Sequence, residues 1–196
     1  MPFSVFIVAA FLLGGIIILA NYSVQFHILG SPLTFGALTY PFSFLVLDIL
    51  SEKYSKKETI KTLALALLIA FYPSYLSATP QIALASIAAF CVSQPLDVVL
   101  FYTLKRIAPK IWWLRGCSST LIAQFFDTVI FFSVAFFGVK TFGECLAMAV
   151  ADYAIKAAVS IANTPLFWLF AIAPFFKNKR LSKLANITQY KSKRHI

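Results

Sequence analysis

The segment LIAQFFDTVIFF, residues 121–132, carries one carboxylate in an otherwise apolar run. Nine of its twelve residues are Leu, Ile, Ala, Phe or Val, and Asp127 lies one helical turn after Gln124. An aspartate in the middle of a membrane helix costs about 2.5–3.5 kcal/mol on insertion scales. The eleven Leu, Ile, Phe and Val residues of 118–138 offset that cost. Asp127 therefore fits a membrane helix only with a partner, a proton or a water-filled cavity beside it.

The motif Q-x-x-D-x-x-x-F occurs twice, with the second copy 30 residues after the first. The first copy consists of Gln94, Asp97 and Phe101, and the second of Gln124, Asp127 and Phe131. Residues at i, i+3 and i+7 share one face of a helix, so each copy aligns an amide, a carboxylate and an aromatic ring. Repeats of this kind occur in transporters, whose binding sites lie between related halves near the middle of the membrane. We expect both copies to face one ligand cavity.

Further polar positions in apolar segments extend this set. Asp152 and Lys156 are spaced i, i+4 in the favourable order. They form either a self-neutralising pair that helps the helix insert or part of the cavity lining. Thr128 adds a hydroxyl beside Asp127, and Asn163 lies just before Pro165, where a helix must kink. We include these polar side chains in the candidate substrate site.

A second polar group is predicted near one end of the helices. Asp48 and Glu52 are like charges at i, i+4, which repel each other unless a cation or ligand lies between them. Arg115 and Ser119 lie at the matching end of a later helix. We interpret this group as an ion pair of Arg115 with Asp48 or Glu52, and a gate made of that pair is a hypothesis.

The elements that position these residues are predicted to be membrane helices. Hydrophobic residues make up 60% of the 196 residues and charged residues only 12%, whereas a soluble domain carries about 25% charged residues. Several apolar runs reach the ~20 residues that cross a bilayer. The fold class is therefore an all-α integral membrane protein with six transmembrane helices, several kinked at proline. The predicted helices are 3–21, 34–50, 60–78, 80–104, 118–138 and 144–174.

The basic residues predict the orientation of the chain. The connections 51–61 and 105–116 and the segment 177–196 together hold 15 of the 17 Lys and Arg residues. The positive-inside rule places these segments, and hence both termini, in the cytoplasm, which requires an even number of crossings. We expect a transmembrane transporter domain in residues 1–176. A basic cytoplasmic tail in residues 177–196 would orient the chain and attract anionic lipid.

The sequence gives little support for a cofactor, a metal or a direct nucleic-acid partner. The three cysteines lack CxxC spacing, and His27 and His195 lie far apart, so no metal site is expected. No P-loop is present, so any ATP would be used by another chain. The basic tail lacks the aromatic residues that mark RNA-binding segments. The remote enzyme alternative, an intramembrane aspartyl protease with paired aspartates, lacks the expected Y-D and G-x-G-D surroundings. We therefore predict that the protein is not an enzyme.

Four segments resemble one known family, the queuosine precursor transporters, also called the vitamin uptake transporter family. They are TYPFSFLVLDILSEKY, SQPLDVVLFY, WWLRGCSSTLIAQFFDTVIFF and YAIKAAVSIANTPLF. The resemblance covers about residues 20–170. It implies a six-helix protein of the cell inner membrane that imports 7-deazapurine precursors (preQ0, preQ1 or queuine) for tRNA modification. Departures from the family pattern at Ser55, Gly116 and Cys117 lie outside the two Q-x-x-D copies.

The chemistry of such a ligand agrees with the resemblance. A 7-deazaguanine offers two N–H donors to a carboxylate and a carbonyl to an amide, and its flat bicycle stacks on an aromatic ring. We expect Asp97 and Asp127 to bind it with help from Gln94 and Gln124, and either aspartate could bind the base edge. The alternatives are a carrier of another nucleobase or vitamin, and a substrate-capture subunit with an ATP-driven partner. The sequence leaves the energy source and the formation of homo-oligomers open.

Overall fold

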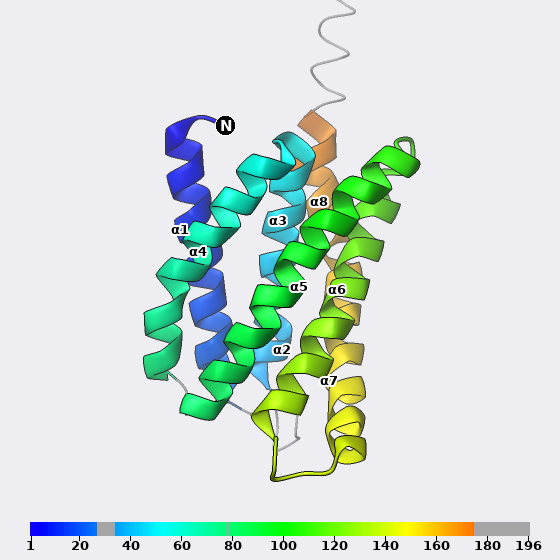
Figure 1. Cartoon of the computed structure of the whole chain (residues 1–196). Helices are drawn as coiled ribbons and strands as arrows, with labels where there is room; N and C mark the ends of the chain where they lie inside the picture. Colours follow the sequence, from blue (N-terminus) through cyan, green and yellow to red (C-terminus); the bar gives the residue numbers. More distant parts are fainter. Residues whose placement is uncertain (27–33, 78, 175–196) are drawn as a thin grey trace, which may run out of the picture.

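The computed structural model describes residues 1–26, 34–77 and 79–174, and this part of the chain forms helices without a β-strand (Figure 1). The helices are α1 (Phe3–Ser23), α2 (Phe35–Thr39), α3 (Pro41–Lys53), α4 (Lys56–Ser77), α5 (Pro80–Ile107), α6 (Trp112–Ala135), α7 (Phe142–Ala162), α8 (Thr164–Phe167) and the π-helical η1 (Trp168–Ile172). The N-terminus and the end of η1 lie at the same end of the bundle, at the top of Figure 1. We call this the terminal end and the opposite one the far end. The predicted tail 177–196 lies outside the described residues.

The described chain is a multi-pass helical membrane protein by the length and composition of its helices. Five segments are long and apolar enough to cross a membrane: Phe3–Ser23, Lys56–Leu76, Pro80–Ile107, Trp112–Ala135 and Phe142–Ile172. Large apolar side chains are turned outward, with Phe3, Leu68 and Phe137 at 78%, 75% and 83% exposed. Many polar side chains are instead buried between the helices. This inverted distribution suits a bundle whose outer face meets lipid and whose interior holds the polar groups.

The predicted helix 34–50 is divided into α2 and α3. Pro41 lacks an N–H and cannot continue the hydrogen-bond ladder of α2, so it occupies the first turn of α3 instead. Neither piece alone is long enough to be counted as a span, which is why five long segments are found where six helices were predicted. Tyr40, at the junction, is only 3% exposed, so its side chain is turned into the bundle.

The predicted helix 144–174 is interrupted next to Pro165, as its sequence indicated. α7 ends at Ala162 and Asn163 caps it. α8 begins at Thr164 with Pro165 in its first turn, and Trp168–Ile172 then widens into a π-helix. Proline and π-helical turns free backbone groups, which membrane helices tolerate where protein or a wet cavity receives them. Asn163 is 6% exposed, so a polar side chain is buried at this interruption, as Tyr40 is at the other.

Two predicted connections are shorter than expected. α4 begins at Lys56 inside the predicted loop 51–61, and α6 begins inside the predicted loop 105–116. The charges of these segments suggested solvent-exposed loops. Arg115 instead lies within α6, and its guanidinium is paired with Glu52 of α3 at 2.9 Å.

Close helix packing holds the frame of the site in place. A Cβ on Gly14 of α1 would lie 3.2 Å from the carbonyl oxygen of Ala66 in α4, so glycine permits the near approach of these two helices. The main core cluster contains Leu13, Ile17, Ala20, Tyr40, Phe44, Leu47, Leu63, Ala66, Ala70, Phe90, Val98 and Ala123. Tyr40 stacks on Phe90 with ring centroids 4.9 Å apart, so the α2–α3 junction is fixed against α5.

Candidate functional site

A cavity of about 530 Å³ lies among α1, α2, α4, α5, α6 and α7. Residues from the last turns of α1 and α6 and the first turns of α2 and α5 line it, so it lies toward the far end of the bundle, where these turns are seen in Figure 1. Its volume falls within the roughly 300–1,000 Å³ of small-molecule sites. Three of the residues predicted for the substrate site besides Asp127 line it, namely Phe131, Asp152 and Lys156.

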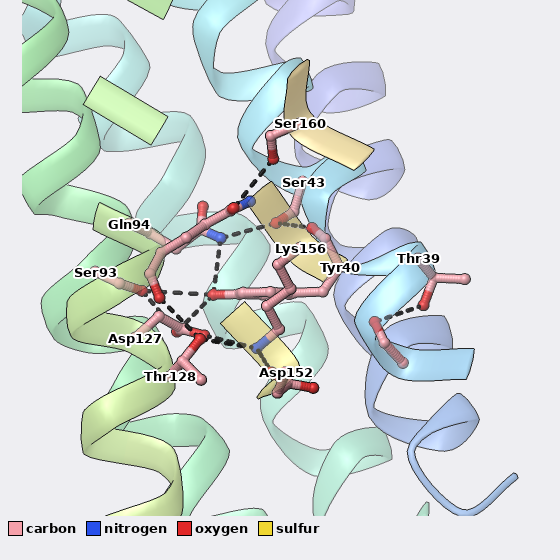
Figure 2. Close-up of polar contacts among 12 residues, drawn as sticks. Thr39, Tyr40, Ser43, Ser93, Gln94, Asp127, Thr128, Asp152, Lys156 and Ser160 are labelled. Atoms are coloured by element: carbon pink, nitrogen blue, oxygen red, sulfur yellow. Dashed lines mark hydrogen bonds and ion pairs between the residues drawn. The ribbon is translucent and has the colours of Figure 1, made fainter. Parts of the chain in front are cut away.

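Asp127 forms the centre of the polar wall of this cavity. Its Oδ1 accepts a hydrogen bond of 2.7 Å from the Tyr40 hydroxyl and one of 2.8 Å from Ser93 Oγ. Its Oδ2 lies 3.5 Å from Lys156 Nζ (Figure 2). The side chains come from four different helical segments, because Tyr40 sits between α2 and α3, Ser93 on α5, Asp127 on α6 and Lys156 on α7. The buried carboxylate therefore ties together the wall of the cavity.

Lys156 joins the two carboxylates of the cavity. Its Nζ lies 2.8 Å from Asp152 Oδ2 and donates to Thr128 Oγ1 at 3.3 Å. The same ammonium lies 4.9 Å from the centre of the Tyr40 ring, within cation–π range. The predicted i, i+4 ion pair of Asp152 and Lys156 thus forms, and Asp127 is a second carboxylate beside the same ammonium. With Asp127 and Asp152 ionised, this cluster carries two negative charges and one positive charge.

The two glutamines lie behind the cavity wall. Gln94 Nε2 donates to Ser43 Oγ at 2.8 Å and to the Tyr40 hydroxyl at 3.4 Å. Gln124 Oε1 accepts a hydrogen bond of 3.0 Å from Ser160 Oγ. Both side chains are fully buried, and neither is among the residues that line the cavity. Gln94 Oε1 and Gln124 Nε2 form no hydrogen bond with the part of the chain that the structure describes, so each amide has one polar atom that is not used.

Asp97 lies apart from the cavity, contrary to the expectation that both motif copies would face one hollow. It is fully buried beside Thr120, whose Oγ1 is 3.4 Å from Asp97 Oδ1 and 3.0 Å from Asp48 Oδ2. The reason is the direction of the helices, since α5 and α6 run antiparallel (Figure 1). A step of three residues moves about 4.5 Å along a helix, and in antiparallel helices the two steps point in opposite directions. The repeat therefore places Asp127 toward the far end and Asp97 toward the terminal end.

The aromatic residues of the motif divide in the same way. Phe131 lines the cavity together with Phe132, whereas Phe101 is fully buried in a cluster with Phe167 and Ile172. Phe101 and Phe167 meet edge to face with their centroids 6.2 Å apart. Phe101 thus contributes to the apolar core near the terminal end and does not line the cavity.

A network of charged side chains joins the helices near the terminal end. Glu52 pairs with Arg115 at 2.9 Å and with Lys105 at 3.5 Å, so the ion pair predicted for Arg115 forms with Glu52 and not with Asp48. Arg115 also donates to the Pro109 carbonyl at 3.1 Å. This network links α3, α5 and α6, while Ser119 of α6 donates within its own helix to the carbonyl of Gly116. The remaining predicted residue, Asn163, lines a small hollow next to Asp48.

Several contributors were not predicted from the sequence. Tyr40, Ser43, Ser93 and Ser160 supply hydroxyl partners to the acid and the amides, and Lys105 shares Glu52. Single hydroxyls are common in membrane helices, so they give little signal in a sequence. The Tyr-Pro pair at 40–41 was the available signal. Proline disfavours helical backbone at the residue before it, so a helix break was to be expected next to Tyr40.

Lipid-facing helices around a cavity with a buried charged wall define a multi-pass membrane protein with a small-molecule site. Comparison with known proteins gives the particular family. Residues 70–170 match the family model described as "Putative vitamin uptake transporter". The chain belongs to this family, as the resemblance predicted, and is therefore a transporter, not an enzyme.

Its curated relatives come from several bacteria. A Bacillus subtilis protein named "Probable queuosine precursor transporter" is 34% identical over 164 residues, which cover 71% of this chain and 72% of the relative. A Haemophilus influenzae protein of the same name is 31% identical, with 53% and 52% covered. The Escherichia coli "Queuosine precursor transporter" is 30% identical, with 72% and 75% covered. No solved structure matches the chain. Membership places the protein in the bacterial inner membrane as a multi-pass transporter.

Proposed function

We propose that this chain imports queuosine precursors, 7-deazapurines of the preQ0, preQ1 or queuine type, and binds them in the cavity beside Asp127. The observation that carries the proposal is a buried carboxylate on the wall of a cavity of about 530 Å³ that also presents aromatic rings. Relatives that are 30–34% identical to the chain over the matched residues are named for queuosine precursors. The precursors serve tRNA modification, so the chain supplies a small molecule and needs no contact with nucleic acid.

The groups around the cavity suit a 7-deazaguanine. Adjacent N–H donors on the base edge bind to the Asp127 carboxylate, which keeps lone-pair sites beyond those used by Tyr40 and Ser93. The rings of Phe131 and Phe132, which both line the cavity, are perpendicular to each other, so the flat bicycle stacks on the face of one of them. The contact between Lys156 Nζ and Asp127 Oδ2 is long, at 3.5 Å. A ligand that takes the place of Lys156 at this oxygen therefore breaks only a weak hydrogen bond of the protein.

The charge of the cavity favours the aminomethyl precursor, preQ1. Asp127 and Asp152 together outweigh the single ammonium of Lys156 by one negative charge. A ligand with one positive charge neutralises this excess. We therefore propose that preQ1 binds more tightly than preQ0, whose nitrile is uncharged.

The transport path is proposed from the two ends of the bundle. We assign α2 and α3 together as a sixth crossing and place both termini in the cytoplasm, in accordance with the basic connections. The cavity then opens to the outside, and the Glu52–Arg115–Lys105 network closes the inside as a gate. Import follows when that network separates and the far end closes over the ligand.

A rescue assay tests this function. The chain is expressed in a bacterial strain that makes no queuosine precursor and lacks its own importer, and each precursor is supplied separately at limiting concentration. Queuosine in tRNA should appear, and preQ1 should support it at the lowest concentration. Glu144→Gln, an acid-to-amide change in the first turn of α7, is the matched control and should behave as wild type. Absence of queuosine with every precursor, despite normal amounts of protein in the membrane, would refute the proposal.

A further inference from the structure

Two buried carboxylates outside the substrate cavity meet at one hydroxyl. Asp48 of α3 is 5% exposed and Asp97 of α5 is 0% exposed. Thr120 Oγ1 lies 3.0 Å from Asp48 Oδ2 and 3.4 Å from Asp97 Oδ1. A threonine hydroxyl has one hydrogen, so it donates to only one of the two acids at a time. The other oxygens, Asp48 Oδ1 and Asp97 Oδ2, are buried without a hydrogen-bond partner among the described residues.

The charged groups nearby do not neutralise this pair. Arg115 and Lys105, from α6 and α5, both pair with Glu52 one turn further along α3, at 2.9 and 3.5 Å. Within the described ranges, neither Asp48 nor Asp97 forms an ion pair with a basic group. Two like charges at membrane depth without a counter-ion are strongly unfavourable, and one of them is removed when a proton binds.

The remaining groups that face the pair are neutral. α6 contributes the thiol of Cys117 and the hydroxyl of Ser119, and the α7–α8 junction contributes Asn163. Asn163 is 6% exposed, and its Nδ2 has no hydrogen-bond partner. It shares with Asp48 the wall of a hollow of about 20 Å³, which is room for one water molecule. The Asn163 side chain thus adds a polar group to the wall of the hollow beside Asp48.

The geometry favours a proton over a metal ion. Asp97 is not on the wall of the small hollow, so the two carboxylates do not converge on a shared space where a metal could be coordinated. A Cβ on Gly116 would lie 3.2 Å from Asp48 Oδ2, which shows how closely that oxygen packs against α6. A proton needs no coordination shell, because it forms an O–H bond to a single carboxylate oxygen.

The pair is connected to the substrate site through one helical turn. Gln94 lies three residues before Asp97 on α5, and its amide donates to Ser43 on α3 and to the Tyr40 hydroxyl, which donates to Asp127. A change in the distance between α3 and α5 at the acid pair therefore moves the partners of the substrate carboxylate.

We propose that the Asp48–Asp97 pair binds one proton in each transport cycle and couples import to the proton gradient. A proton from outside water forms an O–H bond with one carboxylate, which leaves one acid and one carboxylate around Thr120. The same O–H bond breaks when the terminal end opens, and the proton passes to cytoplasmic water. This inference rests on the proposed import function, and the arms of its test separate the two.

Purified protein in proteoliposomes, with the membrane potential clamped at zero, tests the coupling with tritiated preQ1. An acid-outside gradient of ~1 pH unit should support a ~10-fold accumulation. One pH unit is a tenfold difference in proton concentration, and one proton is imported with each preQ1. Asp48→Asn and Asp97→Asn should lose the accumulation but retain exchange of labelled for unlabelled preQ1, and Glu144→Gln should retain both. Accumulation that ignores the pH gradient or follows a sodium gradient would overturn the proposal, as would accumulation at the wild-type level in both amide variants.

Two further readouts keep the test independent of the variants' folding and of substrate identity. In wild-type vesicles, import of preQ1 should lower the pH of the lumen, as reported by an enclosed pH-sensitive dye. Import without this fall in pH would overturn the coupling. If preQ1 is not transported, the proposed function fails, and infrared spectroscopy of the purified protein still tests the proton site. A protonated carboxyl band should titrate in wild type and Asp127→Asn and be lost in Asp97→Asn. A band unchanged in Asp97→Asn would overturn the proton site.

Discussion

At the scale of single residues, the buried acids differ in how the structure compensates them. Asp127 has two hydroxyl donors and a nearby ammonium, whereas Asp97, within the described residues, lies beside the hydroxyls of Thr120 and Ser119 and no ammonium. Lys156 is held by Asp152 at 2.8 Å and by Asp127 at 3.5 Å, with its side chain 8% exposed. Because a buried ion that loses its partner is costly, this lysine supports the fold of the cavity as well as its charge.

Replacing Lys156 by Met should destabilise the protein and reduce uptake. The change leaves two carboxylates without a cation, and breaking a buried pair costs about 3–5 kcal/mol. The melting temperature of purified protein in detergent and uptake in cells measure the effect. Adding Asp152→Asn to Lys156→Met returns the cluster to one negative charge, so the double variant should recover part of the melting temperature. Lys140→Met, at an exposed lysine, is the control. An unchanged melting temperature in Lys156→Met would show that the pair has no structural role.

At the scale of elements, two interrupted helices and one charged network set the shape of the path. The breaks at Tyr40 and Asn163 turn polar side chains into the bundle, and the network around Glu52 binds α3 to α5 and α6. Small displacements at such junctions become discrete states because packed helices do not deform continuously. Opening of the terminal end should therefore depend on the Glu52–Arg115 contact more than on any apolar contact nearby.

Replacing Glu52 by Gln should open the terminal end more often. Cys117, half-buried on α6 beneath the network, then reacts faster with a small maleimide. The measurement uses a background in which Cys91 and Cys145 are replaced by Ser, so that only Cys117 is labelled. A several-fold faster rate is expected in Glu52→Gln. Exchanging the charges, with Arg at 52 and Glu at 115, should restore the slower rate. Equal rates in all three proteins would argue against a gate at this contact.

At the scale of the whole molecule, the connections define two faces that differ in their content of basic residues. The terminal end carries the basic connections, and the far end, at the bottom of Figure 1, carries Lys140 as its one basic residue within the described connections. This asymmetry is the basis for a cytoplasmic terminal end and an outward cavity. The sixth crossing that we propose for α2 and α3 agrees with the same arrangement, because α1 and α4 both begin at the terminal end.

Single cysteines at the two faces test this orientation. In a cysteine-free background, Val139→Cys should react in intact cells with a reagent that does not cross the membrane. Lys110→Cys should react only after the membrane is permeabilised. Both positions are exposed in the connections on either side of α6. The opposite pattern would invert the topology, and equal reaction at both positions would mean that α6 does not separate the two sides.

The sequence predicted the charged residues better than their partners. Asp127 and Lys156 could be recognised because burying their charges in an apolar segment requires compensation. Tyr40 and Ser93 could not, since a hydroxyl in a membrane helix costs little and leaves no clear pattern. The separation of Asp97 from the cavity depends on helix direction and depth, which a motif within one helix does not contain. Proline marked both interrupted helices, but not the side to which each break would turn its polar residue.

Equilibrium binding is the most direct test of the central claim, that a queuosine precursor binds at Asp127. Tritiated preQ1 is titrated against purified wild type, Asp127→Asn and the control Glu144→Gln in lipid nanodiscs. Loss of a charged hydrogen-bond partner costs about 1.5–3 kcal/mol, so Asp127→Asn should bind roughly 10- to 100-fold more weakly while the control is unchanged. Equal affinity of Asp127→Asn and wild type for preQ1 would contradict the account.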